Sequence, residues 1–478
     1  MCGAWKDVPT VIACCCLVLL TSGPQTTAVP TGGETTSALP LFDPSRSSSA
    51  NMEMSLPLRV RYSDANTELT GLVCRDDVRL GEYKGRVAFA CWTTAPNQMF
   101  WSRMGNGVLG LAPRYQKQHD EDKHPLPPPM LLSLTSPKAK DSNVAGMPPK
   151  FAFMASKSAA ELQMGGFVPG SVQGKMRTVQ SLSTKSYTLS IGSIKIGNDF
   201  DTAQELLTFD PTDKHHHIPA LLDTGSPCIM LPGSQENGKL LKSPYSLYQD
   251  HNKKWSKMFI TVNGMDIGLE LNREDLEVEH HTFLDEAWGT SLRPCVMPVT
   301  WAMKSPHQTP IVLGAVFFRA YNVLFDLSKS SPTVPPDIGL GKINPAYNVI
   351  GISDYAVNVK GGDGANVHRV FVQHTPTKIT SKSPEEVGVA NPNGHQFLAQ
   401  IFMGTPRQPL RVVVDTGSPL FGLFVSPDAV GKYNGADTGV AHRRPPPLQV
   451  FPPSSLDSTA DVAERLGIVL GGARRRGA

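Results

Sequence analysis

The chain lacks long apolar runs, an excess of charge of one sign and any Asn-x-Ser/Thr sequence. Its clearest apolar run, Val11–Leu20, is too short to cross a bilayer, which needs about 20 residues. The 45 Lys and Arg nearly balance the 42 Asp and Glu, for a net charge of +3, so we expect no nucleic-acid partner. Without an acceptor sequence, N-glycosylation is not expected.

Motifs of metal and nucleotide sites are also missing. The zinc-protease sequence HExxH, a Walker-type loop and the G-x-S-x-G nucleophile elbow do not occur. The runs His215–His217 and His280–His281 have no carboxylate at ligand spacing, and we interpret them as solvated loops. We therefore expect no metal and no cofactor.

Turn-forming residues are abundant, with 42 Gly and 41 Pro. They separate short runs rich in β-branched and aromatic residues, such as Tyr187–Gly197 (YTLSIGSIKIG) and Tyr321–Leu327 (YNVLFDL). Runs of this length and composition are typical of strands rather than helices. The sequence therefore predicts a mostly β fold.

The N-terminus has the pattern of a secretory signal. Lys6 precedes the apolar run, and small residues suited to cleavage follow it up to Ala28. We interpret residues 1–28 as a signal peptide and expect the secretory pathway, with an extracellular or acidic vacuolar or lysosomal destination. A short anchor or a mis-assigned start stays open.

Four cysteines remain after the signal: Cys74, Cys91, Cys228 and Cys295. An even number in an oxidising compartment indicates disulfides, although three connectivities are possible. A hairpin centred between residues 82 and 83 would place Cys74 directly opposite Cys91, close enough to bond. This predicts the pairs Cys74–Cys91 and Cys228–Cys295, with four free buried thiols as the alternative.

The tetrapeptide Asp-Thr-Gly-Ser occurs twice, at Asp223–Ser226 and at Asp415–Ser418. Each copy follows an apolar strand and precedes Pro. The strand would deliver the Asp to the end of a buried sheet, and the Gly allows a tight turn and a close backbone approach. The Thr hydroxyl can brace the turn, and the Ser hydroxyl can donate to the carboxylate and hold it ionised. Two such loops facing each other could hold a water molecule between two carboxylates.

The repeated loops resemble the active-site loops of the pepsin-like aspartic peptidases, with nepenthesin-like and plasmepsin-like relatives. The resemblance implies catalytic residues Asp223 and Asp415, supported by the Thr, Gly and Ser residues that follow each of them. They are Thr224, Gly225, Ser226, Thr416, Gly417 and Ser418. In that family one carboxylate is ionised and takes a proton from water, while its protonated partner polarises the scissile carbonyl.

Further segments resemble the same family. Tyr62 stands where the family has its flap tyrosine, although Ala65 replaces a usual Gly. Gly105–Ala112 (GNGVLGLA) resembles the segment that supports the first-lobe aspartate, and Ile311–Ser328 resembles its counterpart in the second lobe. Gly394–Pro419 resembles the start of the mature first lobe. The resemblance implies a bilobal, mostly β fold.

The order of these segments differs from the family's. Asp223 precedes its supporting Leu313 by 90 residues, and the same spacing counted back from Leu109 falls on Leu19, inside the signal. The first lobe thus lacks a DTGS segment of its own. Either the chain is circularly permuted and Asp415 completes that lobe, or it is a fragment of a tandem array or a faulty gene model.

The tandem interpretation is favoured by a repeated element, because Leu41–Ala50 (LFDPSRSSSA) is echoed near the C-terminus by Val450–Ala460 (VFPPSSLDSTA). A clean permutation should not contain that segment twice. The domain boundaries that we expect are a signal peptide (1–28), a partial first lobe with flap (29–180), a second lobe with DTGS (181–345), a linker (346–393) and a partial second copy of the first lobe (394–478).

The expected function is aspartic endopeptidase activity on protein or peptide substrates at acidic pH, by a monomer. The alternative is a catalytically inactive homologue that acts as a peptide-binding or inhibitory module. The separation of Asp223 and Asp415 discriminates between them, because a single carboxylate would leave hydrolysis very slow.

Overall fold

The chain divides into two units, Met1–Val430 and Gly431–Ala478, and every described residue belongs to the first. The computed structural model describes residues 41–61, 68–94, 105–115, 126–135, 148–157, 159–207, 218–232, 235–236, 239–240, 255–265, 268–282, 289–299, 311–351, 356–374, 378–381, 389–390 and 397–425. Strands predominate among them, which confirms the predicted mostly β fold.

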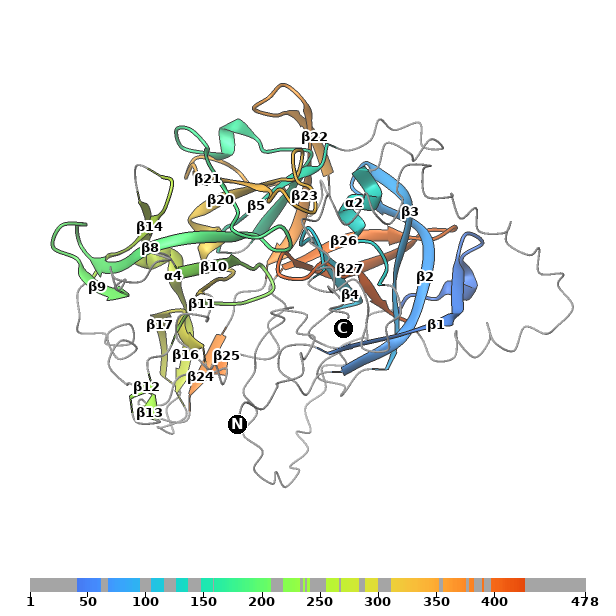
Figure 1. Cartoon of the computed structure of the whole chain (residues 1–478), viewed down its shortest axis with the longest axis horizontal. Coiled ribbons are helices and arrows are strands. Elements are labelled where there is room, and N and C mark those ends of the chain that lie inside the picture. Colours follow the sequence, from blue (N-terminus) through green and yellow to red (C-terminus); the bar gives the residue numbers. More distant parts are fainter. Residues whose placement is uncertain are drawn as a thin grey trace, which may run out of the picture. The chain divides into compact units, whose positions relative to one another are not determined.

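The largest sheet contains fourteen strands and joins segments from both ends of the chain (Figure 1). Its order is β1 (Asn51–Arg61), β2 (Glu68–Leu80), β3 (Tyr83–Thr94), β28 (Gly422–Phe424), β4 (Gly107–Gly110), β27 (Gln408–Asp415), β26 (Phe397–Met403), β23 (Asn366–His374), β6 (Ala159–Met164), β5 (Lys150–Ala155), β20 (Tyr321–Asp326), β21 (Asp337–Lys342) and β7 (Arg177–Gln180), with β22 (Ala356–Lys360) paired to β23. The C-terminal strands β27 and β28 thus pair with β4, from the N-terminal quarter of the sequence.

The second sheet contains eight strands. Its order is β15 (Leu269–Asn272), β14 (Lys257–Val262), β8 (Thr188–Gly197), β10 (Ile218–Leu222), β19 (Ile311–Leu313), β11 (Ile229–Pro232) and β18 (Val296–Val299), with β9 (Gln204–Leu207) paired to β8. The central pair, β10 and β19, is parallel and apolar, as expected for strands covered on both faces.

Two smaller sheets and a few short helices complete the described structure. The sheets are β12 (Gln235–Glu236) with β13 (Lys239–Leu240), and β17 (Gly289–Pro294), β16 (Glu277–Thr282), β24 (Lys378–Ser381) and β25 (Val389–Ala390). The helices are α2 (Met130–Thr135), α4 (Arg273–Leu276) and the 3-10 turns η1 (Pro44–Arg46), η2 (Pro169–Ser171) and η4 (Phe317–Arg319). In the part of the chain that the structure describes, no helix has the length and apolar character needed to span a membrane.

The hairpin of β2 and β3 corrects the predicted register. Its turn is centred one residue earlier than expected, because Gly81 takes a left-handed backbone conformation with a φ of 59°. Cys74 therefore lies opposite Phe89, and its predicted direct pairing with Cys91 is wrong. The two cysteines are diagonal neighbours on one face, with Cα atoms 5.8 Å apart, and they form a disulfide.

The segment interpreted as a linker, residues 346–393, also needs correction. Within it lies β23, which pairs with β6 on one side and β26 on the other. In β23, Val367, Val370 and Val372 are buried, with His368 and Arg369 between the first two and Phe371 between the last two. The regular alternation of apolar and polar residues that marks a half-buried strand is therefore absent from this sequence. Residues 366–374 are therefore a central part of the largest sheet rather than a connector.

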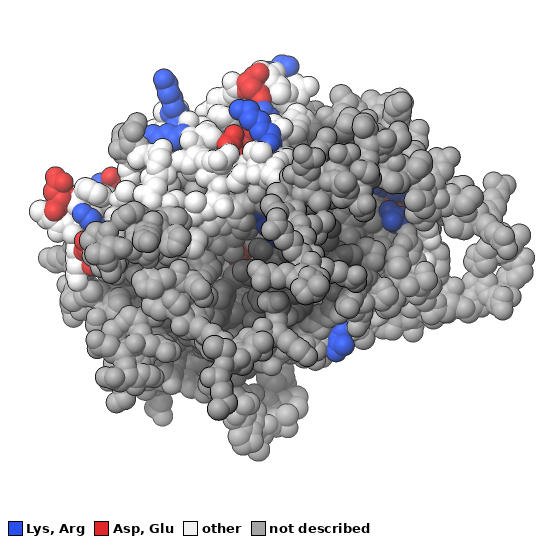
Figure 2. All heavy atoms as spheres, in the orientation of Figure 1, with Lys and Arg blue, Asp and Glu red and all other residues white. Residues whose placement is uncertain are grey.

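Charged side chains on the face shown in Figure 2 are mixed in sign, with Lys and Arg of the described residues interspersed with Asp and Glu. Opposite charges also pair among the described residues: Oε1 of Glu270 lies 2.7 Å from Nζ of Lys257 and 3.6 Å from Nζ of Lys342. This arrangement agrees with the near-neutral net charge of the sequence.

Candidate active site

The first DTGS loop follows β10, which runs parallel to β19. Leu222 lies beside Leu313 in this pair, and the next backbone N–H, that of Asp223, donates to the carbonyl of Leu313 at 3.1 Å. Asp223 is completely buried. The apolar residues of both strands thus hold this carboxyl group at the end of a covered sheet, as the sequence predicts.

The second DTGS loop follows β27, which runs parallel to β4. Val414 lies beside Leu109 and Asp415 beside Gly110, and the N–H of Leu111 donates to the carbonyl of Asp415 at 2.8 Å. The segment that resembles the support of a first-lobe aspartate therefore lies against Asp415. Asp415 is also completely buried.

Reciprocal hydrogen bonds join the two loops. The N–H of Thr224 donates to Oγ1 of Thr416, and the N–H of Thr416 donates to Oγ1 of Thr224, both at 3.0 Å. Each hydroxyl also donates across to the other strand, from Thr224 to the carbonyl of Val414 at 2.7 Å and from Thr416 to that of Leu222 at 2.9 Å. Residues almost 200 positions apart in the sequence are thus held within one buried network.

The glycines of the two loops allow the carboxyl groups to meet. The N–H of Gly225 donates to Oδ1 of Asp223, and the N–H of Gly417 donates to Oδ1 of Asp415, both at 2.9 Å. A methyl group on Gly225 would lie 2.9 Å from Oδ1 of Asp415, and one on Gly417 would lie 2.6 Å from Oδ1 of Asp223. Each glycine therefore faces the opposite aspartate, and a larger residue would crowd it.

The electrostatics of the pair favour a shared proton. Burial raises the pKa of Asp223 well above its ordinary value, and the charge of Asp415 and a hydrogen bond with it raise the pKa further. Hydrogen bonds from Ser226, whose Oγ donates to Oδ2 of Asp223 at 2.7 Å, and from Gly225 oppose this shift. The sequence predicts that the serine keeps the carboxylate ionised, but in Asp223 burial and the second carboxyl group outweigh it.

Ser418 has a different local role from Ser226. Its Oγ accepts the N–H of Leu420 at 3.3 Å, and its carbonyl accepts the N–H of Ala112 at 3.0 Å. Both serines are almost fully buried. Ser418 therefore ties the turn after Asp415 to the segment that supports it.

Tyr187 is a supporting residue that the sequence did not indicate. Its hydroxyl donates to the carbonyl of Leu111 at 2.8 Å, and its own carbonyl accepts the N–H of Leu222 at 2.9 Å. It thus connects the residue before Asp223 with the residue whose N–H binds Asp415. Tyr187 is fully buried, and burial raises its pKa well above the ordinary value. The segment SYTLSIG reads only as a strand, and no local signal distinguishes this tyrosine.

A disulfide lies directly after the first loop. Cys228 is bonded to Cys295, with a Cα separation of 4.8 Å, and the N–H of Ile229 donates to the carbonyl of Cys295 at 3.0 Å. The structure thus contains both predicted disulfides. This one joins the end of the Asp223 loop to the start of β18.

Other predicted residues have different outcomes. Tyr62 and His215–His217 lie outside the described residues. His280 and His281 belong to strand β16, so their interpretation as a loop is wrong. Within the described ranges, no group of three or more His, Cys, Asp and Glu side chains is arranged to hold a metal ion.

Comparison with known families places most of the chain in one of them. The family model described as eukaryotic aspartyl protease matches residues 27–334. The matched stretch contains Asp223 and both supporting segments and ends before Asp415. No curated protein matches the chain.

Proposed function

Because the chain belongs to the eukaryotic aspartyl protease family, we propose that it hydrolyses peptide bonds through a water molecule activated by Asp223 and Asp415. The observation that carries this proposal is the meeting of the two buried carboxyl groups, each facing the glycine of the other loop. Two carboxyl groups this close titrate as a pair and hold one proton between them over the acidic range. We therefore expect activity at acidic pH.

The two carboxyl groups divide the roles between them. The protonated member of the pair donates a hydrogen bond to the scissile carbonyl, and the ionised member takes a proton from the attacking water. The water oxygen bonds to the carbonyl carbon, and the tetrahedral intermediate then releases the amine, which receives a proton from the pair. The Thr224–Thr416 hydrogen bonds keep both loops fixed during these transfers.

We further propose that the site is formed within one chain whose segments are rearranged. The described part of residues 394–478 completes the first lobe, predicted at 29–180, by inserting β27 beside β4. The second lobe, predicted at 181–345, contributes Asp223. We therefore prefer a circularly permuted organisation to a tandem fragment, because the Asp415 loop is hydrogen-bonded to the Asp223 loop of the same molecule.

Several finer points belong to the same proposal. Residues 1–28 act as a secretory signal, and the mature protein is a monomer in an extracellular or acidic compartment. The two disulfides support an oxidising environment. Substrates are proteins or peptides, as expected for the family. The inactive homologue gains no support, because its premise was a missing aspartate in the first lobe, and Asp415 occupies that place.

The test is cleavage of an unfolded protein substrate by the purified full chain between pH 3 and pH 7, with and without pepstatin. We expect pepstatin-sensitive cleavage at acidic pH, reduced by about 100- to 10,000-fold in Asp223→Asn and in Asp415→Asn. Asp199→Asn is the matched control, since Asp199 is exposed and binds only its own turn through Thr202. Undiminished cleavage by folded Asp415→Asn would overturn the proposal.

A further inference from the structure

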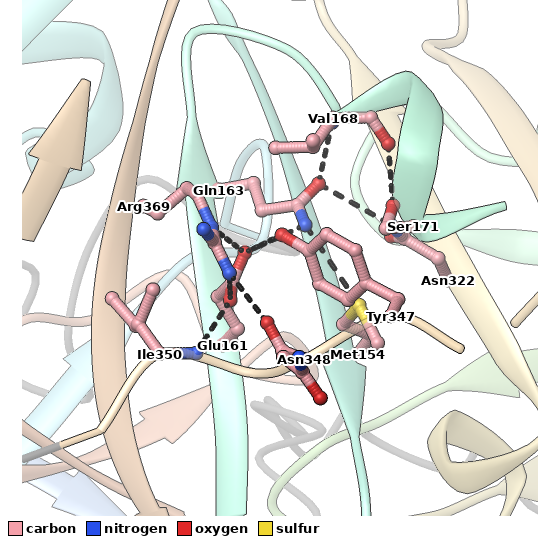
Figure 3. A network of polar contacts seen from close by, with 10 residues as sticks. All are labelled: Met154, Glu161, Gln163, Val168, Ser171, Asn322, Tyr347, Asn348, Ile350 and Arg369. Carbon is pink, nitrogen blue, oxygen red and sulfur yellow. Dashed lines mark hydrogen bonds and ion pairs between the residues drawn. The ribbon is translucent and has the colours of Figure 1, made fainter. Parts of the chain in front are cut away.

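A chain of buried polar side chains crosses the largest sheet away from the aspartates (Figure 3). Nδ2 of Asn322 donates to Oε1 of Gln163 at 3.2 Å, and Nε2 of Gln163 donates to Oε1 of Glu161 at 2.9 Å. The guanidinium of Arg369 binds both oxygens of Glu161, at 2.9 Å and 2.8 Å. Asn322, Gln163 and Glu161 are completely buried, and the Arg369 side chain is 14% exposed.

The two ends of this network lie on different strands of the sheet, β20 and β23, which flank β5 and β6. Asn322 is on β20, which follows η4 and the segment that supports Asp223. Arg369 is on β23, which pairs with β26, and β26 pairs with β27, the strand that ends at Asp415. The β6–β23 ladder therefore joins the part of the sheet that contains β20 (β6, β5, β20, β21, β7) to the part that contains β27 (β23, β26, β27).

Glu161 and Arg369 also bind the segment that connects β21 to β22. The hydroxyl of Tyr347 donates to Oε1 of Glu161 at 2.8 Å, and the N–H of Ile350 donates to Oε2 at 3.2 Å. Nη2 of Arg369 donates to the carbonyl of Asn348 at 2.8 Å. The chain that continues toward Asp415 is thus fixed at its crossing point by Glu161 and Arg369.

The carboxylate of Glu161 has hydrogen-bond donors at both of its oxygens. Its two oxygens accept five hydrogen bonds, from Gln163, Tyr347, Ile350 and both ends of the Arg369 fork. The two parallel hydrogen bonds between Arg369 and Glu161 form only when the planar guanidinium and the carboxylate are aligned. The pair therefore constrains the relative position of the two strands that carry it. Lys in place of Arg keeps the charge but loses the paired contact.

Such a pair can specify the register of two strands. In the β6–β23 ladder, Phe371 lies opposite Glu161 and Arg369 lies opposite Gln163, so the ion pair joins diagonal neighbours. A two-residue slip in one direction would put Arg369 directly opposite Glu161, whereas a slip in the other direction would put it opposite Gly165 and separate the pair. Leaving a buried charge without its partner is strongly unfavourable, so the ion pair disfavours the second slip.

We propose that Glu161 and Arg369 are positioning residues that set Asp415 relative to Asp223 by fixing the register of β23 on β6. The inference rests on the proposed catalytic role of the two aspartates. A displacement of reacting groups by about 1 Å can lower a rate by about 100-fold, so loss of the paired contact should act on kcat.

The test compares Arg369→Lys with Arg273→Lys in the full chain. Arg273 on α4 forms an ion pair at 3.1 Å with Glu277, the first residue of β16, away from the β6–β23 ladder, and its side chain is 17% exposed against 14% for Arg369. With active sites titrated by pepstatin, we expect Arg369→Lys to lower kcat per site by about 10- to 100-fold, with KM changed less than about twofold. The pH profile of kcat/KM should also shift, because the coupling between the two carboxyl groups depends on their separation. Arg273→Lys should change neither.

An unchanged kcat per titrated site and an unchanged pH profile in Arg369→Lys would overturn the inference, even if its melting temperature falls. If Arg369→Lys does not fold, the double variant Glu161→Gln/Arg369→Gln replaces the ion pair by neutral amides for the same measurements. Should the wild-type chain not cleave, the proposed function fails and amide hydrogen exchange tests the positioning alone. Faster exchange at residues 413–418 in Arg369→Lys than in Arg273→Lys supports it, and equal exchange overturns it.

Discussion

Replacing Thr416 by Val removes a hydroxyl that connects two loops almost 200 residues apart, while keeping the shape of the side chain. The hydroxyl accepts the N–H of Thr224 at 3.0 Å and donates to the carbonyl of Leu222 at 2.9 Å. Both contacts are buried, so water cannot replace them. The substitution therefore measures how firmly the Asp415 loop is bound to the Asp223 loop.

The size of the effect follows from the two groups that lose a partner. A buried donor or acceptor left without its hydrogen bond costs about 1–3 kcal/mol, so Thr416→Val should lower the free energy of unfolding by about 2–6 kcal/mol. Thr416→Ser keeps the hydroxyl and should lose only about 1 kcal/mol for the missing methyl group. Thr178, exposed on β7, provides the matched control, with an expected change within about 0.5 kcal/mol for Thr178→Val.

The assay is reversible chemical denaturation of the full chain at pH 7, followed by fluorescence and circular dichroism. The cycle of Thr224→Val, Thr416→Val and the double variant should show coupling, because each hydroxyl accepts the backbone N–H of the other residue. A destabilisation by Thr416→Val no larger than that by Thr178→Val would refute the reasoning. Residues 397–425 would then not be docked against the Asp223 loop.

Two further predictions concern the pH dependence of stability and the space between the carboxyl groups. Burial and, after it, the charge of Arg319 lower the pKa of His374 from 6.5 to about 4. Between those pH values only the unfolded chain binds this proton, so stability falls by about 3 kcal/mol as pH drops through the window. His374→Leu should remove that part of the difference in unfolding free energy between pH 7 and pH 4, and an unchanged difference would contradict it. Gly417→Ala places a methyl group 2.6 Å from Oδ1 of Asp223 and should lower cleavage by about 100-fold, whereas Gly170→Ala, with no atom within 4 Å, should leave it intact. Equal cleavage by both alanine variants would contradict the crowding.

Local features of the sequence were sufficient to predict the two loops. Asp223 and Asp415 each follow a run of apolar residues. A short run of this kind is typical of a strand covered on both faces, so each Asp was expected at the end of a buried strand. The turn chemistry of Thr and Gly then determines the rest of the loop. The mostly β fold was predictable for the same reason, because short apolar runs separated by Gly and Pro favour strands.

Features that depend on tertiary contacts were not predictable from one sequence. The register of β2 and β3 depends on a single backbone angle at Gly81, which composition does not reveal. Strand β23 lacks a regular apolar/polar alternation, since His368 and Arg369 precede Val370, Phe371 and Val372, and it becomes recognisable only between β6 and β26. Tyr187 gains its role because Leu111 and Leu222 meet beside it, although they are far apart in the sequence.

The repeated segment near the C-terminus led the sequence interpretation toward a tandem fragment. The first copy, Leu41–Ala50, lies against the strands before and after the Asp415 loop: the N–H of Asp43 donates to Oε1 of Gln408 on β27, and the N–H of Phe42 donates to the carbonyl of Phe424 on β28. The second copy, Val450–Ala460, lies outside the described residues. Repetition alone could not reveal which copy packs beside Asp415.

The most direct test of a single-chain active site mixes two inactive variants. Asp223→Asn and Asp415→Asn are purified separately as full chains, combined in equal amounts and assayed for pepstatin-sensitive cleavage at acidic pH over a range of concentrations. If both aspartates of a site come from one molecule, the mixture stays as inactive as its components at every concentration. Cleavage that returns on mixing and increases with concentration would mean that the pair forms between molecules, and it would contradict the account.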